Sequence, residues 1–400
     1  MTAVTAVLLW LALASSPQQD ARAEAERLAN AGAHAAALER FQEIAAANPD
    51  DIQARLWIGR LHLVMRQPVR AAAVFESILA TSPQELDALT GLAVALMDAG
   101  RWSEAADALN RAEALAADRI DVLSAQGRFH AAEGRTTLAL AYYGRALAAD
   151  PGNASIRAAV DDVRAVHGHR VTIGYDMQAF DPSAAEMHAG TLEVNVRVTD
   201  RVRLFGRGQA QSFEGETEGR GGAGFEWLMR PRVRIRAGGL FGSDTFWLPG
   251  VDGFADLAYV SGRATWTLSA RYVDFSGGDL WIGGPGLAMS LTPRLTLHLQ
   301  YLRGRTGIDA GDSTTTDGGT IGLAARVTPR FRTSVAYHRG FDRLDWFTRD
   351  RFGASEANTG TVGAELDLTR LASFAASYAY QDRGNTRRVH RASGQLTVRF

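Results

Sequence analysis

Histidines are the clearest candidates for general bases in this sequence, but their spacing does not support catalysis. A hydrolase needs a histidine within reach of a nucleophile such as serine and of an orienting acid. His298, His338 and His390 are the candidates, yet no acid or nucleophile accompanies them at a fixed spacing. His298 and His338 also fall at inward positions of expected strands. The chain has no Cys, which excludes thiol nucleophiles. We therefore predict that the protein is not an enzyme.

Two further patterns could be taken for ligand sites. His167 and His169 flank Gly168 and could bind a metal, but no third ligand accompanies them, as a zinc site would require. The run GRGGAG at Gly219–Gly224 looks like a phosphate loop, yet it opens an expected strand rather than a helix. The formal net charge of -1 gives no reason to expect nucleic acid as a partner. We predict no metal, no cofactor and no nucleic-acid partner.

Arginine is the charged residue that dominates the second half of the chain. All 43 basic residues are arginines; residues 170–400 hold 28 of them against 24 acidic residues, whereas residues 1–169 hold 15 against 20. Many of the 28 alternate with apolar residues and therefore share one face of a strand, which should point into a wet lumen because charge is costly against lipid. Such charges either form salt bridges with acids or line an open path that favours anions. The candidate lumen-lining residues are Arg170, Asp176, Glu193, Arg197, Arg232, Arg234, Arg236, Arg271, Arg326 and Arg332, joined by Glu365 and Arg399.

The elements that must position these arginines are β-strands. Period-two alternation occurs at 170–177, 192–198, 232–237 and 295–301. Tight turns are expected near Asp200, Pro231, Gly262, Pro293, Pro329 and Thr369, and longer loops between them, such as 304–318 and 340–358. Short turns at one rim and long loops at the other are typical of outer-membrane barrels. We predict that residues 168–400 form a transmembrane antiparallel β-barrel of about 14 strands (roughly 12–16), with strand 1 beginning near Arg170.

The end of the chain, GQLTVRF, places Leu396, Val398 and Phe400 on one apolar face. A terminal Phe on an alternating strand resembles the assembly signal of bacterial outer-membrane proteins. The resemblance implies that the barrel-assembly machinery recognises these three residues. A soluble all-β domain that happens to end in Phe is the alternative.

The first half of the chain repeats every 34 residues. Pro49 and Pro83 lie 34 residues apart, and Pro151 lies 68 residues beyond Pro83. One repeat position holds Ala37, Ala71, Ala105 and Ala139, and the position four residues later holds Phe41, Phe75, Leu109 and Tyr143. A small residue lets paired helices approach, and the aromatic fills the groove between them. The pattern resembles the tetratricopeptide (TPR) repeat over the units 18–51, 52–85, 86–119 and 120–153, and residues 154–166 would cap the stack.

This resemblance implies an α-solenoid at 18–167 whose concave face binds a protein or a polymer; a spacer without a bound partner is the alternative. The apolar run Ala3–Ala14 is shorter than the roughly 20 residues that a spanning helix needs, and it ends in the small-residue pattern of a cleavage site. We predict a signal peptide at 1–16. The chain would then be a multidomain α + β protein, with its barrel in the outer-membrane lipid and its TPR domain in the periplasm.

TPR units ahead of a barrel of this size resemble the YaiO-type outer-membrane barrel family. More distantly they resemble the export porins of exopolysaccharide systems. The resemblance implies a conduit or accessory for export of a polysaccharide or other envelope polymer. The alternative is a non-conducting anchor whose TPR domain scaffolds periplasmic proteins; a barrel hydrolase acting on lipid is a third class.

Overall fold

The computed structural model describes residues 17–181, 185–242, 249–275, 278–308, 313–340, 357–383 and 388–400. The expected signal peptide at 1–16 lies outside these residues. Internal contacts divide the chain into two compact units, Met1–Val160 and Asp161–Phe400, and each is described by itself below. Among the described residues, no helix combines the length and the apolar character needed to cross a membrane.

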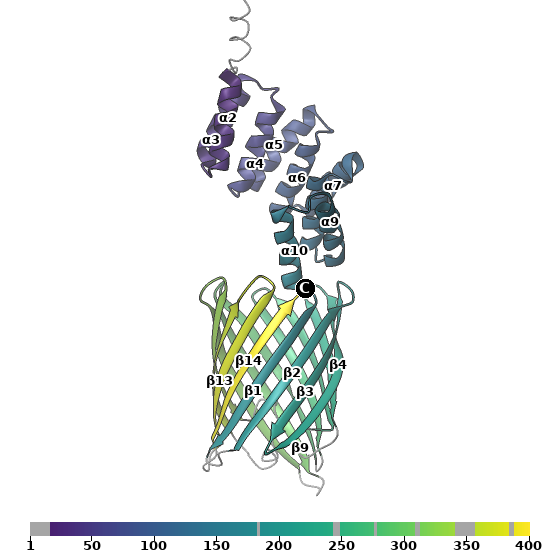
Figure 1. Ribbon diagram of the computed structural model, residues 1–400, viewed down its shortest axis with the longest axis vertical. Helices are drawn as coiled ribbons and strands as arrows, with labels where there is room; N and C mark the ends of the chain where they lie inside the picture. Colours follow the sequence, from purple (N-terminus) through teal and green to yellow (C-terminus); the bar gives the residue numbers. More distant parts are fainter. Residues whose placement is uncertain are drawn as a thin grey trace, which may run out of the picture. The chain divides into compact units, whose positions relative to one another are not determined.

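The described part of the first unit is built from antiparallel helix pairs (Figure 1). Each pair coincides with one of the four repeat units expected from the sequence, and α10 follows them as the expected cap. The prediction of a TPR solenoid is confirmed. The helices are α2 (Pro17–Asn30), α3 (His34–Ala47), α4 (Ile52–Val64), α5 (Pro68–Thr81), α6 (Leu86–Asp98), α7 (Trp102–Ala116), α8 (Ile120–Ala132), α9 (Thr136–Ala149) and α10 (Ala154–His167).

The repeat positions identified in the sequence form the core of this unit. They are at most 4% exposed: Ala37, Phe41, Ala71, Phe75, Ala105, Leu109, Ala139 and Tyr143. The Phe75 ring on α5 is packed between Gly59 of α4 and Gly91 of α6, where an added Cβ would lie 2.5 Å from the ring in each case. Glycines on the preceding and following helices therefore make the room that the Phe75 ring fills.

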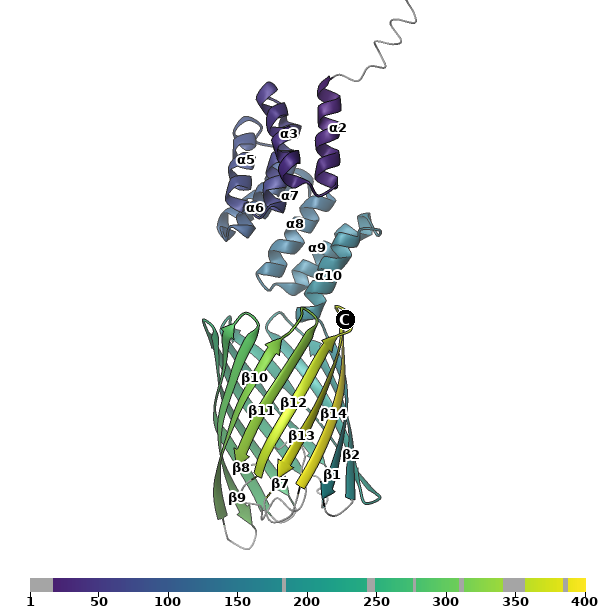
Figure 2. The ribbon, with the colours of Figure 1, turned by 90° about the vertical axis from the view of Figure 1, so that its left-hand side faces the viewer.

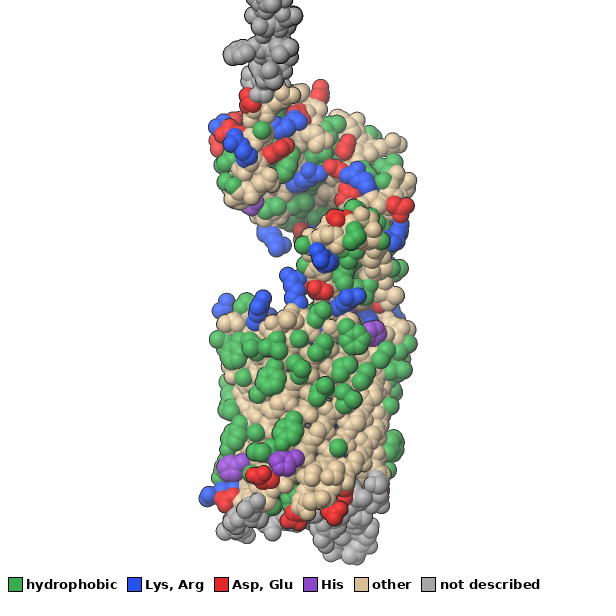
Figure 3. All heavy atoms as spheres, in the orientation of Figure 1, with side chains coloured by type: hydrophobic (Ala, Val, Ile, Leu, Met, Phe, Trp, Pro, Cys, Tyr) green, Lys and Arg blue, Asp and Glu red, His purple; other side chains and the backbone are tan. Residues whose placement is uncertain are grey.

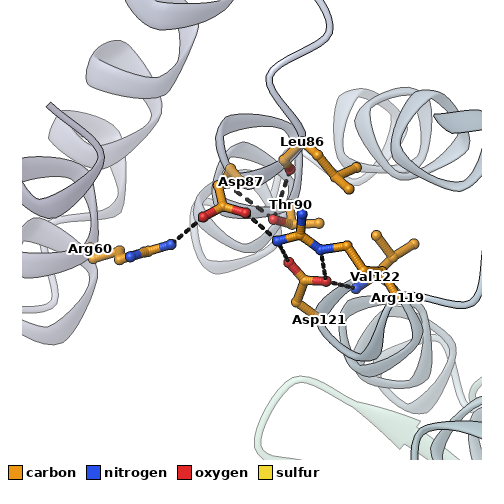
Figure 4. Close-up of polar contacts among 7 residues, drawn as sticks. All are labelled: Arg60, Leu86, Asp87, Thr90, Arg119, Asp121 and Val122. Carbon is orange, nitrogen blue, oxygen red and sulfur yellow. Dashed lines mark hydrogen bonds and ion pairs between the residues drawn. The ribbon is translucent and has the colours of Figure 1, made fainter. Parts of the chain in front are cut away.

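Ion pairs join the first helices of successive repeats (Figure 4). Arg60 on α4 donates to Asp87 on α6 at 2.6 Å, and Arg119 at the start of α8 donates to the other oxygen of Asp87. Arg119 also donates to Asp121 at 2.9 Å. Because the two arginine side chains are 43% and 49% exposed, these pairs orient the repeats more than they stabilise them.

The second unit is a closed antiparallel barrel of 14 strands (Figures 1 and 2), and the predicted fold class is confirmed. Strand β1 begins at Arg170 and pairs with β14 along its whole length, from Arg170↔Arg399 to Asp181↔Arg388. The strands are β1 (Arg170–Asp181), β2 (Ala185–Arg197), β3 (Val202–Phe213), β4 (Glu216–Arg230), β5 (Val233–Gly242), β6 (Val251–Ser261), β7 (Ala264–Phe275), β8 (Gly278–Thr292), β9 (Leu295–Ile308), β10 (Ser313–Arg326), β11 (Phe331–Gly340), β12 (Ala357–Asp367), β13 (Ala372–Asp382) and β14 (Arg388–Arg399).

All six tight turns lie where the sequence places them, between β2 and β3 and then after every second strand. The opposite rim differs from expectation. The loop expected at 304–318 is mostly strand, because β9 continues to Ile308 and β10 starts at Ser313. The β3–β4 connection is only Glu214–Gly215, and both residues have positive φ, 50° and 88°, as a tight hairpin turn requires. Of the loop expected at 340–358, residues 341–356 lie outside the described part.

The reason for this difference is that backbone pairing extends beyond the apolar part of the strands. At 313–318 the residues Ser-Thr-Thr-Thr-Asp-Gly carry no apolar alternation, yet they pair with 302–307 of β9. The period-two alternation of apolar residues marks only the part of a strand that has one apolar face. Sequence alternation therefore underestimates strand length at this rim.

The outer wall of the barrel is apolar, and the inner wall is polar. Large apolar side chains that alternate along the strands are exposed on the outside, for example Ile173 at 57%, Leu268 at 57% and Val362 at 54%. Figure 3 shows hydrophobic side chains spread over the outer wall, with charged side chains near its ends. The alternate residues of the same strands carry the buried Asp176, Gln178 and Asn195. Apolar side chains outside and polar side chains inside are the reverse of the arrangement in a water-soluble protein. They are the pattern of a lipid-facing barrel.

Candidate functional site: a polar passage through the barrel

Two adjoining cavities run along the lumen. The larger, about 660 Å³, is lined toward the longer-loop rim by Gln178, His338 and Arg391, and we call it the loop-side cavity. The smaller, about 450 Å³, is lined by Arg170, Thr172 and Arg399 near the tight turns, and we call it the turn-side cavity. Both cavities are lined by the same junction residues, Thr191, Arg207, Glu365, Ala375 and Gln395. The two cavities therefore adjoin each other within the described part of the barrel, and together we call them the path.

Small side chains keep one wall of this path open. Strands β11 to β14 contribute mainly Ala, Ser, Thr and Gly to the loop-side cavity, including Ala336, Thr361, Ala375, Ser377 and Ala379. None of these reaches far from the wall, so space remains beside them. The loop-side cavity consequently lies mainly against the β11–β14 side of the lumen.

Large side chains fill the wall formed by β3 to β6. Phe205 and Phe254 stack with their ring centroids 6.0 Å apart. The Arg236 guanidinium lies 4.9 Å from the Phe205 centroid and 5.2 Å from that of Phe254. The Phe205 ring lies against Gly224 and Gly238, at each of which a Cβ would clash with it. A cation over two aromatic faces is favourable, so this cluster narrows the lumen from one side.

Several residues that the sequence placed in the lumen do line the path. Arg170, Glu193, Arg236 and Arg399 line the turn-side cavity, Asp176 and Arg332 the loop-side cavity, and Glu365 both. Arg391 donates to Asp176 at 2.6 Å, and Arg332 donates to Glu365 at 2.7 Å and to Asp367 at 3.0 Å. Arg236 and Glu193 lie 3.8 Å apart. Most charge on the path is therefore already paired.

Four other predicted lumen residues do not line the two cavities. Arg232 belongs to the turn between β4 and β5, not to a strand. Arg234 on β5 pairs with Glu226 at 3.6 Å. Arg326 is the last residue of β10, and its backbone N–H donates to the carbonyl of Arg294. Arg197 donates to the carbonyl of His167 at 3.2 Å and to Asp200. None of these four lines either cavity.

Arg271 belongs to a buried ionic network that the sequence did not reveal. Asp252 on β6 accepts hydrogen bonds from Arg220 on β4 at 2.9 Å and from two nitrogens of Arg271 on β7, each at 2.7 Å. Arg220 also donates to Gln209 on β3 at 3.0 Å. The side chains of Arg220 and Asp252 are each only 2% exposed. Four strands are thus tied together inside the barrel.

The histidines do not converge on one site. His169 lies between barrel strands: its backbone exchanges two 3.0 Å hydrogen bonds with Phe400, and its Nδ1 accepts from the backbone N–H of Arg197. Burial, and then the charges of Arg197 and Arg203, lower the pKa of His167. His338 is buried against Thr320 at 2.8 Å, whereas His390 bonds to the exposed Tyr378. Within the described residues, no group of three or more His, Cys, Asp or Glu side chains could hold a metal ion.

The last strand presents its apolar residues to the outside. Leu396, Val398 and Phe400 are 39%, 42% and 54% exposed. Phe374 on β13 lies beside Leu396, and Ile173 on β1 lies on its other side. The three residues are thus part of the apolar outer wall.

Comparison with known protein families supports the TPR repeats of the first unit. Residues 22–85 and 65–129 match two models described as tetratricopeptide repeat. No curated protein matches the chain in sequence. Among solved structures, a thermophilic TPR protein of Thermus thermophilus is similar at 23% identity over 38% of this chain and 83% of that chain, with a TM-score of 0.36.

Two further solved structures are similar to this chain. A bacterial polysaccharide outer membrane secretin aligns over 58% of this chain and 98% of its own, at 10% identity and a TM-score of 0.41. An anion-selective porin from Comamonas acidovorans aligns over the same shares, at 9% identity and a TM-score of 0.36.

Proposed function

We propose that this protein is an outer-membrane barrel whose lumen conducts a polysaccharide or another envelope polymer, or assists its export, and whose TPR domain docks periplasmic proteins or the polymer. The pair of adjoining cavities in the lumen is the observation that carries this proposal. The two cavities are lined from Gln178 and His338 at one end to Arg170 and Arg399 at the other. Hydroxyl, amide and charged groups on such a path can replace the hydration of a sugar chain.

The membrane location is supported by the outer wall. Large apolar side chains are exposed on the outside of every strand. In water such a surface would make the molecules associate with one another, whereas contact with lipid tails stabilises it. A closed barrel also leaves no unpaired strand edge in the hydrocarbon. The even strand count places the start of β1 and the end of β14 at the tight-turn rim, which is the periplasmic rim in such barrels. That arrangement fits a TPR domain in the periplasm.

The TPR domain is proposed to act through protein contacts, since TPR solenoids present extended binding surfaces. We propose no catalytic role, no cofactor and no nucleic-acid partner. The further partners that we propose are outer-membrane lipid and the barrel-assembly machinery. The second candidate function is a non-conducting anchor for a periplasmic scaffold. The Phe205–Arg236–Phe254 cluster favours it, because that cluster already occupies one side of the lumen.

Conductance of the purified full chain in planar lipid bilayers separates these two functions. We expect stable ion conductance, because charged and hydroxyl-bearing side chains line both cavities. Ala375→Trp should remove most of it, since Ala375 lines both cavities at their junction. The matched control is Val362→Trp, on the neighbouring strand β12, whose side chain is 54% exposed on the outer wall and should tolerate the ring in lipid.

The conduit fails if the wild-type barrel is folded in the bilayer yet electrically silent, and the anchor then becomes the preferred function. Equal conductance of the wild type and of Ala375→Trp would show that current flows outside the path described above.

A further inference from the structure

Three arginines on the path differ from all its other arginines in having no acidic partner. Arg236, Arg332 and Arg391 each lie within 4 Å of a carboxylate. Arg170, Arg207 and Arg399 form no ion pair with any acid in the described part of the chain. All three line the turn-side cavity. The uncompensated positive charge of the path is therefore concentrated in one place.

Two of these arginines are held directly opposite each other. Arg170 on β1 and Arg399 on β14 are register partners at the strand pair that closes the barrel. Alternation points both side chains inward, because Val171 and Val398 beside them belong to the outer wall. Like charges at directly opposite positions destabilise a sheet. Arg399 donates to the Ser373 hydroxyl at 3.3 Å, which brings no negative charge to the pair.

Arg207 faces them from another part of the wall. It lies on β3, whereas Arg170 and Arg399 lie on β1 and β14. It also lines both cavities, so a group that moves from one cavity to the other passes it. Three guanidinium groups around one wet cavity are a donor set that matches the oxygens of a carboxylate, sulfate or phosphate group.

The remaining lining of this cavity suits a hydroxyl-rich molecule. Thr172, Thr191, Thr397 and Gln395 line it, and the Thr172 and Thr397 hydroxyls are 3.1 Å apart. Three acids line the same cavity, and each is engaged by an arginine: Glu193 by Arg236, Glu226 by Arg234 and Glu365 by Arg332. A volume of about 450 Å³ is within the usual size of a small-molecule site.

We propose that Arg170, Arg207 and Arg399 form a binding site for the anionic groups of an acidic saccharide at the turn-side end of the lumen. This inference rests on the proposed conduit, because the site lies on its path. It names the class of polymer: one that carries carboxylate or phosphate groups. Binding of the anion offsets the repulsion between Arg170 and Arg399, so the arrangement that costs stability in the empty barrel becomes favourable when occupied.

Calorimetric titration of the folded full chain in detergent tests the site without requiring conductance. The probes are glucuronate, inorganic phosphate and glucose at equal ionic strength. We expect binding of at least one anion that weakens as salt rises, and far weaker binding of glucose. Glucuronate above phosphate would indicate a uronate-bearing polymer, and the reverse order a phosphate-bearing one; both support the site.

Variants identify the residues. Arg170→Gln, Arg207→Gln and Arg399→Gln should each weaken anion binding about tenfold, the usual effect of losing one charge-assisted hydrogen bond. Arg303→Gln, an exposed arginine on β9, should leave binding unchanged and serves as the charge-matched control. Arg170→Gln should also raise the unfolding temperature, because it removes a repulsion, whereas a purely structural arginine would lower it.

The outcomes separate this inference from the proposed function. If the barrel conducts but binds glucuronate, phosphate and glucose alike, or if the glutamine variants bind as the wild type does, the site is wrong and the conduit stands. If anions bind as expected to a barrel that does not conduct, the site stands and the conduit is wrong.

Discussion

Replacing Phe400 by Asp is expected to reduce the folded barrel in outer-membrane fractions to a small part of the wild-type level, while the TPR domain folds normally. Leu396, Val398 and Phe400 form an apolar row on the outer face of β14, and Phe400 ends it with 54% of its surface exposed. A charge in that row removes the apolar end that an assembly machine would recognise. Heat-modifiable mobility on gels measures the folded barrel.

Val327→Asp is the control for this experiment. Val327 lies in the tight turn after β10, at the same rim as Phe400, and is also 54% exposed. If lipid-facing stability alone mattered, both variants would keep similar, nearly normal levels of folded barrel, since charges near the interface cost only about 0–1 kcal/mol. Recognition of the last strand predicts loss for Phe400→Asp and near-normal levels for Val327→Asp and Phe400→Tyr. Equal levels in all three variants would contradict it.

The largest effect on stability is expected at Asp252. Asp252→Ala leaves Arg220, with a side chain 2% exposed, and Arg271 inside the barrel without their shared carboxylate. Breaking a buried ion pair from one side costs about 3–5 kcal/mol, because a charge remains buried and uncompensated. The urea concentration that abolishes heat-modifiable mobility should therefore fall markedly.

Asp181→Ala serves as the control for that loss. Asp181 and Arg388 also pair between barrel strands, at 3.9 Å, but their side chains are 54% and 58% exposed. An exposed pair is worth at most about 1 kcal/mol, so this variant should unfold near the wild-type urea concentration. Adding Arg271→Ala to Asp252→Ala should recover part of the loss, because one of the two stranded charges is then removed. No difference between Asp252→Ala and Asp181→Ala would show that the buried network is not a stabilising one.

The sequence was sufficient for the architecture because both units repeat. The 34-residue period makes Ala71 equivalent to Ala37 and Phe75 equivalent to Phe41, and all four prove fully buried. The turns at Pro231 and Pro293 come after alternating runs, and strands end at Arg230 and Thr292. In each case a local pattern reports a local structure.

The lumen could be predicted only in part, because its contacts join strands far apart in the sequence. Alternation predicts that Arg170 and Arg399 face inward. It does not predict that the two are direct register partners with no acid beside them. Arg220 lies in a glycine-rich run in which no large apolar side chain marks the outer face. The alternation pattern therefore does not identify Arg220 as a lumen residue. Counting back from Phe225 and Trp227, which face outward, would have assigned Arg220 to the inner face.

The central claim is a barrel with lipid outside and a water-filled path inside, and cysteine accessibility along β13 tests it most directly. The chain has no Cys, so each single variant carries one reactive thiol. In proteoliposomes, Ala375→Cys, Ser377→Cys and Ala379→Cys line the path and should react with a charged, membrane-impermeant thiol reagent. Phe374→Cys, Tyr378→Cys and Tyr380→Cys lie on the outer wall and should react only after denaturation. Equal reaction of both sets before denaturation, or no reaction at the three inner positions, would contradict the account.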